Sequence, residues 1–388
     1  MLTLLRHADL YAPHAVGLRD LLIGGGQVLA IGKNLPALGG AEAVEEVDLE
    51  GRRVVPGLVD CHVHVTGGGG EDGFASRVPP LALSRFVRAG ITSCVGVLGT
   101  DGSTRTMREL VATTLGLREQ GLSAWCYTGS YQYPPITLTG SVRDDIVFID
   151  PVIGVGEFAL SDHRSSQPTL SEFLRLVSDA YVAGMISGKS GFSHLHMGDG
   201  SRGFELIRRA LDESELPARV FHPTHINRRK ALFAEALKLS ERGVPMDVTA
   251  FPADDDSYSA AESIERWIKA GCDLNNLTCS SDGAGCLPVF DEHGHMTHMD
   301  IGQPVTLIET LAELLEAGLP LERVLPVFTS NPARIAGLTR KGRIEVGLDA
   351  DLVVLSPNHQ VISVLSRGQW MMRDKKLLRR GTFEGSSA

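Results

Sequence analysis

Short apolar runs alternate with longer amphipathic segments along most of the chain, between about residues 53 and 281. A short apolar run is typical of a strand buried on both faces, whereas apolar positions three and four residues apart indicate a helix. The predicted strands are Val54–Val65, Ile91–Leu98, Ala124–Tyr127, Val152–Leu160, Ser193–Met197, Ala218–Ile226, Met246–Phe251 and Leu277–Ser281. The helices predicted between them are Thr104–Gln120, Leu170–Ile186, Phe204–Leu211, Ala231–Glu241 and Ala260–Ala270. Such an alternation predicts an α/β fold whose parallel strands close into a (β/α)8 TIM barrel.

The first fifty residues and the tail after about Gly342 have a different pattern, with short strands and glycine-rich turns. The strands predicted near the start are Leu2–Leu5, Leu21–Ile23 and Gln27–Ile31. The tail G-R-I-E-V-G-L-D-A-D-L-V-V-L-S-P returns to strands. Two further helices, at Val305–Ala317 and Leu321–Leu338, are predicted between the barrel strands and this tail.

These patterns divide the chain into two predicted domains. Residues 56–340 would form the barrel, and residues 1–55 together with residues 341–388 would form one small β domain beside it. An open, doubly wound sheet is the alternative architecture. No G-x-G-x-x-G motif opens a helix after the first strand, so the glycine fingerprint of a dinucleotide-binding sheet is missing.

Composition and charge are ordinary for a globular protein and exclude some partners. The 388 residues are 43% hydrophobic and 22% charged. The 37 basic and 47 acidic residues give a formal net charge of −10 without a Lys/Arg cluster, so we expect no nucleic-acid binding. We also expect no membrane span, because the chain contains no apolar run of about 18 residues. Six cysteines without a C-x-x-C pair favour a reducing compartment, and we predict a cytoplasmic protein.

The candidate chemistry begins at D-C-H-V-H, at the end of the first predicted barrel strand. Side chains two residues apart on a strand point to the same side. His62 and His64 should therefore both face the mouth of the barrel, where barrel active sites lie. Two imidazoles at this spacing form half of a zinc site. For H-x-H alone, two histidines held by hydrogen bonds in a core are an equally good interpretation.

Polar residues at other strand ends favour the metal interpretation. His196 and His225 end the fifth and sixth predicted strands, and Asp282 follows the eighth. Four imidazoles and an aspartate could bind two metal ions if an anionic ligand bridges them. Glu157 is the one ionisable residue of the fourth strand, V-I-G-V-G-E-F-A-L, and is the predicted bridge. The alternatives are a strand-end carboxylate in a hydrogen-bond network and, for the whole set, coincidence.

Several segments together resemble the isoaspartyl dipeptidases of the amidohydrolase superfamily. They are D-C-H-V-H followed by G-G-G-G-E, then V-L-G-T-D, T-G-S-Y, S-D-H-R-S, H-M-G-D, P-T-H-I-N-R and S-S-D-G-A-G. The H-x-H pair is shared by the whole superfamily, whereas G-G-G-G-E, S-D-H-R and H-I-N-R are more particular to the isoaspartyl dipeptidases. The resemblance covers nearly the whole chain and implies a binuclear zinc barrel, a flanking β-sandwich domain and homo-oligomeric assembly.

The resemblance also implies a reaction and a set of metal ligands. A hydroxide that bridges two divalent ions, expected to be Zn²⁺, would hydrolyse a β-aspartyl dipeptide to aspartate and an amino acid. By the resemblance, His62 and His64 hold the more buried ion, and His196 and His225 hold the more exposed one. Asp282 would bind the buried ion and carry a proton during catalysis.

The resemblance further implies how the dipeptide is bound. Tyr131 matches the residue that polarises the scissile carbonyl, and Glu71 matches the acceptor for the substrate ammonium. Thr100 lies in a segment that contacts the substrate. Arg164 and Arg228 match the residues that bind substrate carboxylates, and the planar fork of an arginine side chain suits this task.

Two positions depart from the family. Members typically have a carbamylated lysine where this chain has Glu157, and the segment up to S-D-H-R is one residue longer here. The additional glycine could form a bulge that directs Glu157 toward the metals. Cys286 stands where the family has a serine that contacts the substrate carboxylate, and a thiol is a weaker donor than a hydroxyl.

Two other functions remain open at this point. Another amide hydrolase or deaminase of the superfamily, acting on an N-acyl amino acid or a cyclic amide, could use the same metals, and Glu157 is compatible with it. A catalytically inactive, structural relative is the alternative of a different class. Such a relative would be expected to lose metal ligands, whereas every ligand position is filled in this chain.

Overall fold

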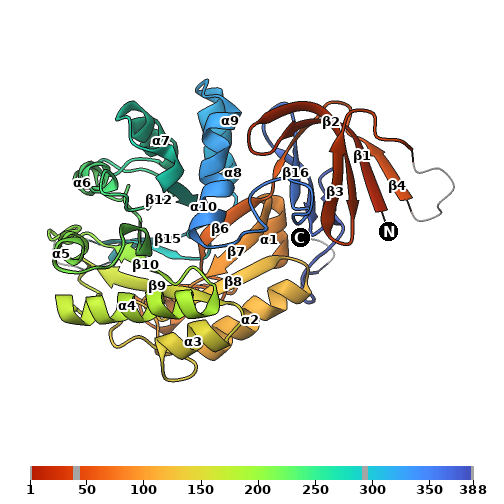
Figure 1. Ribbon diagram of the computed structural model, residues 1–388. Coiled ribbons are helices and arrows are strands. Elements are labelled where there is room, and N and C mark those ends of the chain that lie inside the picture. The colour runs from red at the N-terminus through yellow and green to blue at the C-terminus, as the bar shows by residue number, and fades with distance from the viewer. Residues whose placement is uncertain (1, 38–43, 291–295, 386–388) are drawn as a thin grey trace.

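The computed structural model describes residues 2–37, 44–290 and 296–385, and the predicted barrel lies within them (Figure 1). Its strands are β6 (Leu58–Val63), β7 (Ile91–Gly96), β8 (Ser123–Thr128), β9 (Val152–Leu160), β10 (Phe192–Met197), β11 (Phe221–Thr224), β12 (Met246–Thr249) and β13 (Leu277–Ser280). Strands β6 to β11 form one continuous parallel sheet in chain order, and β12 pairs in parallel with β13. The backbone N–H of His64 donates to the carbonyl of Gly283 at 2.9 Å, which joins the end of β6 to the segment after β13. The strand order is that of a TIM barrel.

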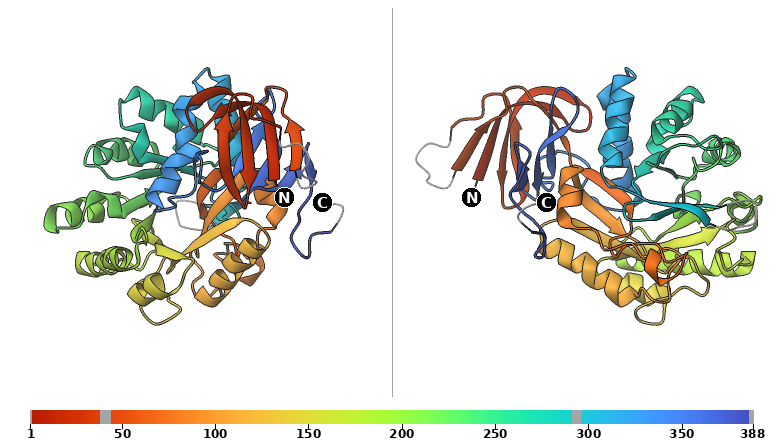
Figure 2. Two further views of the ribbon diagram at one scale, coloured as in Figure 1. Left: turned by 45° about the vertical axis from the view of Figure 1, so that its right-hand side comes forward. Right: turned by 180° about the vertical axis from the view of Figure 1, so that it is seen from behind.

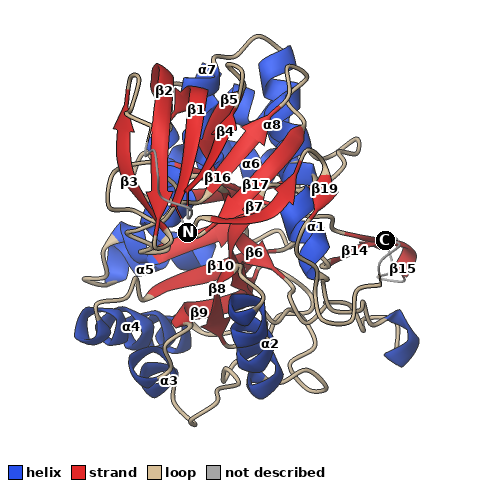
Figure 3. Ribbon diagram, turned by 90° about the vertical axis from the view of Figure 1, so that its right-hand side faces the viewer, coloured by secondary structure: helices blue, strands red, loops and turns tan. Residues whose placement is uncertain are grey.

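Helices connect the barrel strands and lie outside the sheet (Figure 3). They are α1 (Leu83–Arg88), α2 (Met107–Glu119), α3 (Val142–Phe148), α4 (Leu170–Ser187), α5 (Glu205–Glu213), α6 (Lys230–Ser240), α7 (Ala260–Lys269), α8 (Thr306–Glu316), α9 (Leu321–Val324) and α10 (Ser330–Ile335). Short 3-10 helices are η1 (Phe74–Ser76), η2 (Ala218–Val220), η3 (Leu274–Asn276) and η4 (Leu325–Phe328). Thr169 and Ser259 begin α4 and α7 with capping boxes, each formed with the glutamate three residues later. No helix in the described part of the chain is long and apolar enough to cross a bilayer.

Some predicted elements are divided or missing. The predicted strand Val54–Val65 consists of β5 (Arg53–Pro56), which belongs to the small sheet, and β6 of the barrel. The single helix predicted over Leu321–Leu338 is wrong, because α9, η4 and α10 divide this segment. Pro326 and Pro332 explain the division, since proline lacks an N–H and fits only near the start of a helix. The patterns did not predict α1, α3 or the hairpin of β14 (Cys286–Phe290) and β15 (Met296–Ile301).

Both ends of the chain contribute to one mixed sheet, as predicted, and this sheet lies beside the barrel (Figure 2). Its strands are β1 (Leu2–Tyr11), β2 (Ala15–Gly24), β3 (Gln27–Gly32), β4 (Val44–Asp48), β5, β16 (Leu352–Leu355), β17 (Val361–Ser366), β18 (Gln369–Arg373) and β19 (Lys376–Leu377). Strand β5 pairs in parallel with β1 and antiparallel with β16, which joins the two chain ends. A hydrophobic core of its own, including Leu5, Leu10, Val54, Leu352 and Leu365, supports the sheet. The exact limits of this domain at residues 55 and 341 stay a proposal.

Candidate metal centre

The six side chains predicted as metal ligands lie together at the carboxyl ends of the barrel strands. Each lies in a strand or within two residues after it: His62 and His64 (β6), Glu157 (β9), His196 (β10), His225 (β11) and Asp282 (β13). All six are buried, with at most 5% of any of these residues exposed. The carboxyl ends of parallel barrel strands meet at one face, which is why residues far apart in the sequence converge here.

Glu157 is directed into this cluster by a bulge in β9. Val155 pairs with Ser193 of β10, but Phe158 already pairs with Leu195, so two residues of β9 oppose one residue of β10. The bulge predicted from the additional glycine is therefore present. Gly156 lies against the neighbouring strand so closely that a Cβ atom there would come within 2.8 Å of the His194 carbonyl oxygen. A glycine is thus required where the bulge packs on β10.

The carboxylate of Glu157 lies between imidazoles from both sides of the cluster. Its Oε1 atom is 2.6 Å from Nδ1 of His196 and 3.0 Å from Nε2 of His225. Its Oε2 atom is 3.4 Å from Nε2 of His62 and 3.8 Å from Nε2 of His64. Each oxygen therefore faces a different pair of imidazoles, which is the arrangement expected of a carboxylate that bridges two cations.

Asp282 completes the His62 side of the cluster. Its Oδ1 atom is 3.1 Å from Nε2 of His64 and 3.4 Å from Nε2 of His62. Asp282 and His225 both have left-handed backbone conformations, with φ angles of 50° and 60°. Such conformations are unfavourable for residues other than glycine and are typical of functional sites.

The donor set fits divalent metal ions. Within this cluster, three sets of residues have possible ligand atoms that all lie within 4.8 Å of one another: His62, His225 and Asp282; His62, His64 and Glu157; and Glu157, His196 and His225. Within the described residues, Glu157 Oε2, Asp282 Oδ1 and His64 Nδ1 are buried without a hydrogen-bond partner. Burial by itself would raise the pKa of Glu157, but the surrounding imidazoles hold this pKa well below its ordinary value. Buried carboxylates and imidazoles of this kind are good ligands for a metal such as zinc.

Tyr131 and Asp162 both contact His196. The Tyr131 hydroxyl lies 2.7 Å from Nδ1 of His196, and burial raises the pKa of this phenol well above its ordinary value. Tyr131 therefore remains protonated and can donate a hydrogen bond. Asp162 Oδ2 is 2.9 Å from Nε2 of His196 and orients the ring so that Nδ1 faces Glu157. Asp162 was not among the predicted site residues, although it stands in the S-D-H-R segment and contacts both His196 and Arg164.

Glu71 and Arg164 lie next to the cluster and contact one another. Glu71 Oε1 accepts a hydrogen bond from the Thr100 hydroxyl at 2.9 Å and lies 3.4 Å from Nη1 of Arg164. Glu71 Oε2 is buried and, among the described residues, has no hydrogen-bond partner. Nε and Nη2 of Arg164 donate to the two carboxylate oxygens of Asp162 at 3.0 and 2.8 Å.

Burial raises the pKa of the Cys286 thiol to about 12, and the Glu71 carboxylate adds to this effect.

Arg228 reaches the cluster from the segment after β11. Its Nη1 atom lies 3.2 Å from Nε2 of His196, and 19% of its side chain is exposed. Its carboxylate contacts are long, 3.9 Å to Asp162 and 3.9 Å to Asp199. Of the two predicted carboxylate-binding arginines, Arg164 is thus firmly paired with Asp162, whereas Arg228 has weaker protein partners.

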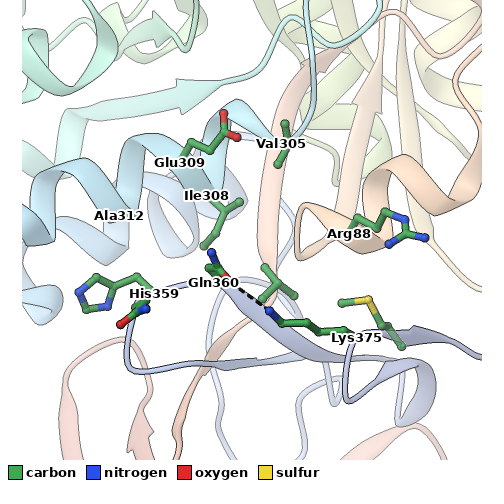
Figure 4. A pocket seen from close by; sticks show the side chains of 11 residues that line it. Arg88, Val305, Ile308, Glu309, Ala312, His359, Gln360 and Lys375 are labelled. Carbon is green, nitrogen blue, oxygen red and sulfur yellow. Dashed lines mark hydrogen bonds between the residues drawn. The ribbon is translucent and has the colours of Figure 1, made fainter.

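Two cavities differ in their relation to this chemistry. A cavity of about 240 Å³ is lined by Glu71, Thr100 and neighbouring residues, and therefore adjoins two of the residues predicted to bind the substrate. Another, of about 330 Å³, lies among α1, α8 and the small sheet and is lined by residues such as Arg88, Glu309 and His359 (Figure 4). None of the predicted site residues is among the described residues that line this second cavity. We therefore predict that the substrate binds in the cavity lined by Glu71 and Thr100.

Asp60 and His194, which contact the predicted ligand His62, were given no role from the sequence. Asp60 accepts hydrogen bonds from the backbone N–H groups of His62 at 3.3 Å and Ser281 at 3.2 Å. Nε2 of His194 lies 2.8 Å from Nδ1 of His62. The signal for His194 was available, because His194-Leu195-His196 repeats the H-x-H spacing and places both imidazoles on the same side of β10.

Comparisons with known proteins bear on this site. The family model described as the amidohydrolase family matches residues 53–371. The crystal structure of a beta-aspartyl dipeptidase from Fervidobacterium islandicum AW-1, in complex with the β-Asp-Leu dipeptide, is 42% identical, with a TM-score of 0.93 over 97% of each chain. A deacetylase from Brucella anthropi is 24% identical over 88% of this chain and 80% of that protein. A dihydropyrimidinase from Brevibacillus agri, 16% identical with a TM-score of 0.67 over 98% of this chain and 97% of that one, shares the fold.

Proposed function

This chain belongs to the amidohydrolase family, and on that premise we propose that it hydrolyses β-aspartyl dipeptides to aspartate and a free amino acid. The observation that carries the proposal is the 42% identity over 97% of the chain to a beta-aspartyl dipeptidase with β-Asp-Leu bound. The arrangement of Glu71, Arg164 and Arg228 beside a buried ligand cluster supports it. The residue roles that follow are part of the same proposal.

The charges beside the cluster suit the charges of an isoaspartyl dipeptide. Such a substrate carries an ammonium group and a free α-carboxylate on the aspartyl residue, and a second carboxylate at its C-terminus. Glu71 would receive the ammonium through its Oε2 atom, which has no hydrogen-bond partner within the described residues. Arg164 and Arg228 would bind the two carboxylates. Arg228 has the weaker protein partners, so it is the arginine whose guanidinium can turn more freely toward a substrate.

Two divalent ions, which we propose to be zinc, would be held by the metal-ligand cluster of His62, His64, Glu157, His196, His225 and Asp282. When bound, such ions lower the pKa of a water molecule toward neutrality and withdraw charge from an amide carbonyl. Glu157 would be the anionic bridge, since its two oxygens face different pairs of imidazoles. A genetically encoded carboxylate would thus replace the carbamylated lysine of typical family members.

Tyr131 and Asp282 would supply the catalytic groups of the protein. The Tyr131 hydroxyl remains protonated and could donate a hydrogen bond to the oxygen of the scissile carbonyl as negative charge develops there. Asp282 is an ionised carboxylate, because neighbouring imidazoles outweigh the effect of burial and lower its pKa well below the ordinary value. It would accept the proton of the attacking water and pass it to the leaving amine.

Two further properties belong to the proposal. All six cysteines lie in described parts of the chain as free thiols, which supports a reducing compartment and therefore the cytoplasm. Homo-oligomeric assembly follows from the family resemblance. A relative acting on N-acyl amino acids or cyclic amides is less well supported, because such substrates lack the ammonium group that Glu71 would bind. An inactive scaffold is also less well supported, because the ligand cluster is complete.

A substrate panel tests the proposed function. The purified protein, with its metal content measured, would be assayed on β-Asp-Leu, α-Asp-Leu, an N-acetylated amino acid and dihydroorotate as a cyclic amide. We expect β-Asp-Leu to have the highest kcat/KM by a wide margin. A higher kcat/KM for either non-peptide substrate would overturn the proposal, and a protein that binds no metal would favour an inactive scaffold.

A further inference from the structure

A row of buried hydrogen-bonding groups extends from His62 of the metal-ligand cluster through side chains of β10, β11, β13 and β12. Nδ1 of His62 lies 2.8 Å from Nε2 of His194, and Nδ1 of His194 lies 3.0 Å from Nδ1 of His222. Nε2 of His222 lies 3.1 Å from the Thr278 hydroxyl, which in turn lies 2.5 Å from Oδ1 of Asp247. All five residues are completely buried. The mechanism above uses His62 alone among them.

At the Asp247 end of this row, the donor and the acceptor of each hydrogen bond can be assigned. The carboxylate of Asp247 accepts hydrogen bonds from the hydroxyls of Thr224 at 2.7 Å and Ser280 at 2.5 Å, in addition to that of Thr278. The carboxylate oxygens of Asp247 are thus the acceptors for all three hydroxyls. The Thr278 hydroxyl has one proton and two acceptors, Oδ1 of Asp247 and, at 3.3 Å, the carbonyl oxygen of Met246. With either acceptor, the Thr278 oxygen must itself accept from His222.

The direction of the Thr278 hydrogen bond determines which nitrogen donates in each of the two histidine–histidine contacts. A neutral imidazole has one N–H and one lone pair. His222 is neutral, because burial lowers its pKa to about 4. Since Nε2 of His222 donates to Thr278, its Nδ1 must accept from Nδ1–H of His194. Nε2 of His194 must then accept from Nδ1–H of His62, so Nε2 is the ring nitrogen of His62 that can give up its proton and bind a metal ion.

We propose that this histidine relay (His194, His222, Thr278 and Asp247) sets the tautomer of His62 and directs its Nε2 lone pair toward Glu157 and Asp282. Nε2 of His62 is the atom that lies 3.4 Å from the carboxylates of both residues. His194 and His222 are therefore positioning residues for the metal ligand His62. The inference rests on the proposed function, because it concerns the same metal centre.

The fold does not require polar side chains at the two histidine positions of the relay. Positions 194 and 222 lie within completely buried strands, where an apolar side chain would avoid the cost of desolvation. Two imidazoles at these positions are tolerated because each ring nitrogen has a partner. A ring that donates its second N–H to another group is held in one tautomer, and such partners typically change metal affinity 10- to 100-fold.

Variants at Thr278 test the relay without changing a metal ligand. Thr278→Val keeps the shape of the side chain but removes the hydroxyl, so Nε2–H of His222 loses its acceptor. Thr278→Ser keeps the hydroxyl and is the matched control. Zinc affinity would be measured by competition with a chelator, and cobalt-loaded protein would be examined by visible absorption. We expect Thr278→Val to bind one of its two ions about 10- to 100-fold more weakly, with altered cobalt bands, and Thr278→Ser to resemble wild type.

A second pair of variants acts next to His62. His194→Leu removes the acceptor for Nδ1–H of His62, whereas His194→Gln can supply an amide oxygen in its place. We expect the loss of zinc affinity to be larger for His194→Leu than for His194→Gln. Thermal unfolding of the metal-free proteins would be measured in parallel, so that loss of fold stability is separated from loss of affinity at 25 °C.

The outcomes distinguish the relay from the metal centre itself. Equal zinc affinities and cobalt spectra for wild type, Thr278→Val and His194→Leu would overturn the relay while leaving the metal centre intact. A wild-type protein that binds no metal would overturn the proposed function instead. Cys61, His222 and Asp247 also lie within ligand distance of one another. A third zinc ion that disappears in Cys61→Ala would therefore replace the relay with a separate metal site.

Discussion

The metal-ligand cluster and the substrate-binding rim, which consists of Glu71, Thr100, Arg164, Arg228 and Cys286, are built in different ways. At most 5% of any cluster residue is exposed, and its charged groups contact mainly one another. Among the charged rim side chains, 9% of Glu71, 11% of Arg164 and 19% of Arg228 are exposed. A buried charge that loses its partner is costly, whereas a rim charge can be solvated. Changes in the cluster should therefore abolish metal binding, and changes in the rim should alter substrate choice with the metals retained.

The largest effect is expected from removal of a cluster imidazole. His62→Ala and His196→Ala should each lose bound metal and at least about 4 kcal/mol of transition-state stabilisation, roughly a thousandfold in kcat. Metal analysis and steady-state kinetics on the same samples would check this, with the exposed His14→Ala as control. Two bound ions and full turnover in either variant would show that the ligands are wrongly assigned.

The second-largest effect is expected from Glu157, because its carboxylate contacts both pairs of imidazoles in the cluster. Glu157→Gln keeps the shape but removes the negative charge, so zinc affinity should fall by at least about tenfold. Reconstitution of the wild-type apoprotein should be equally efficient with and without bicarbonate, because no lysine has to be carbamylated. Activity that depends on bicarbonate would mean that another group forms the bridge.

Rim variants should lose selectivity while keeping both ions. Arg228→Met and Glu71→Gln each remove one charged contact to the substrate, which typically costs about 2–5 kcal/mol, or roughly 30- to several-thousand-fold in kcat/KM on β-Asp-Leu. The surface variants Arg219→Met and Glu119→Gln serve as controls for loss of charge. If either rim variant also lost metal, the division between cluster and rim would not hold.

The smallest effect is expected at Cys286. Cys286→Ser replaces a weak donor by a stronger one, and a single hydrogen bond contributes about 0.5–1.5 kcal/mol. The kcat/KM on β-Asp-Leu should therefore change by less than roughly tenfold, with an increase as the expected direction. A loss as large as that of Glu71→Gln would place Cys286 among the groups that bind the substrate charge.

The barrel and the metal-ligand cluster could be predicted from the sequence for a physical reason. Barrel strands are buried on both faces and leave continuous apolar runs, and the cluster residues stand at their ends, where the parallel arrangement must bring them together. Glu157 was recognisable as the one ionisable side chain in its strand. The bulge at Gly156 followed from the additional residue and is present in β9.

Other features depend on neighbours that are distant in the sequence. Asp162 contacts His196 because the segment just after β9 lies beside the end of the paired strand β10. The relay through His194 and His222 joins β6 to β10 and β11, although β6 and β10 are not neighbours in the sheet, and no local pattern specifies which ring nitrogens meet. The prediction of one helix over Leu321–Leu338 was wrong because it followed the spacing of the apolar residues and ignored the two prolines that divide the segment.

Selectivity between peptide isomers tests the central claim most directly, because we propose that the cluster supplies the chemistry and that the rim recognises the free α-carboxylate and ammonium of an isoaspartyl residue. The kcat/KM values for β-Asp-Leu and α-Asp-Leu would be measured for wild type and Glu71→Gln, with metal content determined on each sample. We predict a strong preference of wild type for β-Asp-Leu, and a much smaller preference for Glu71→Gln with both ions still bound. Equal hydrolysis of the two isomers by fully metallated wild-type protein would contradict the account.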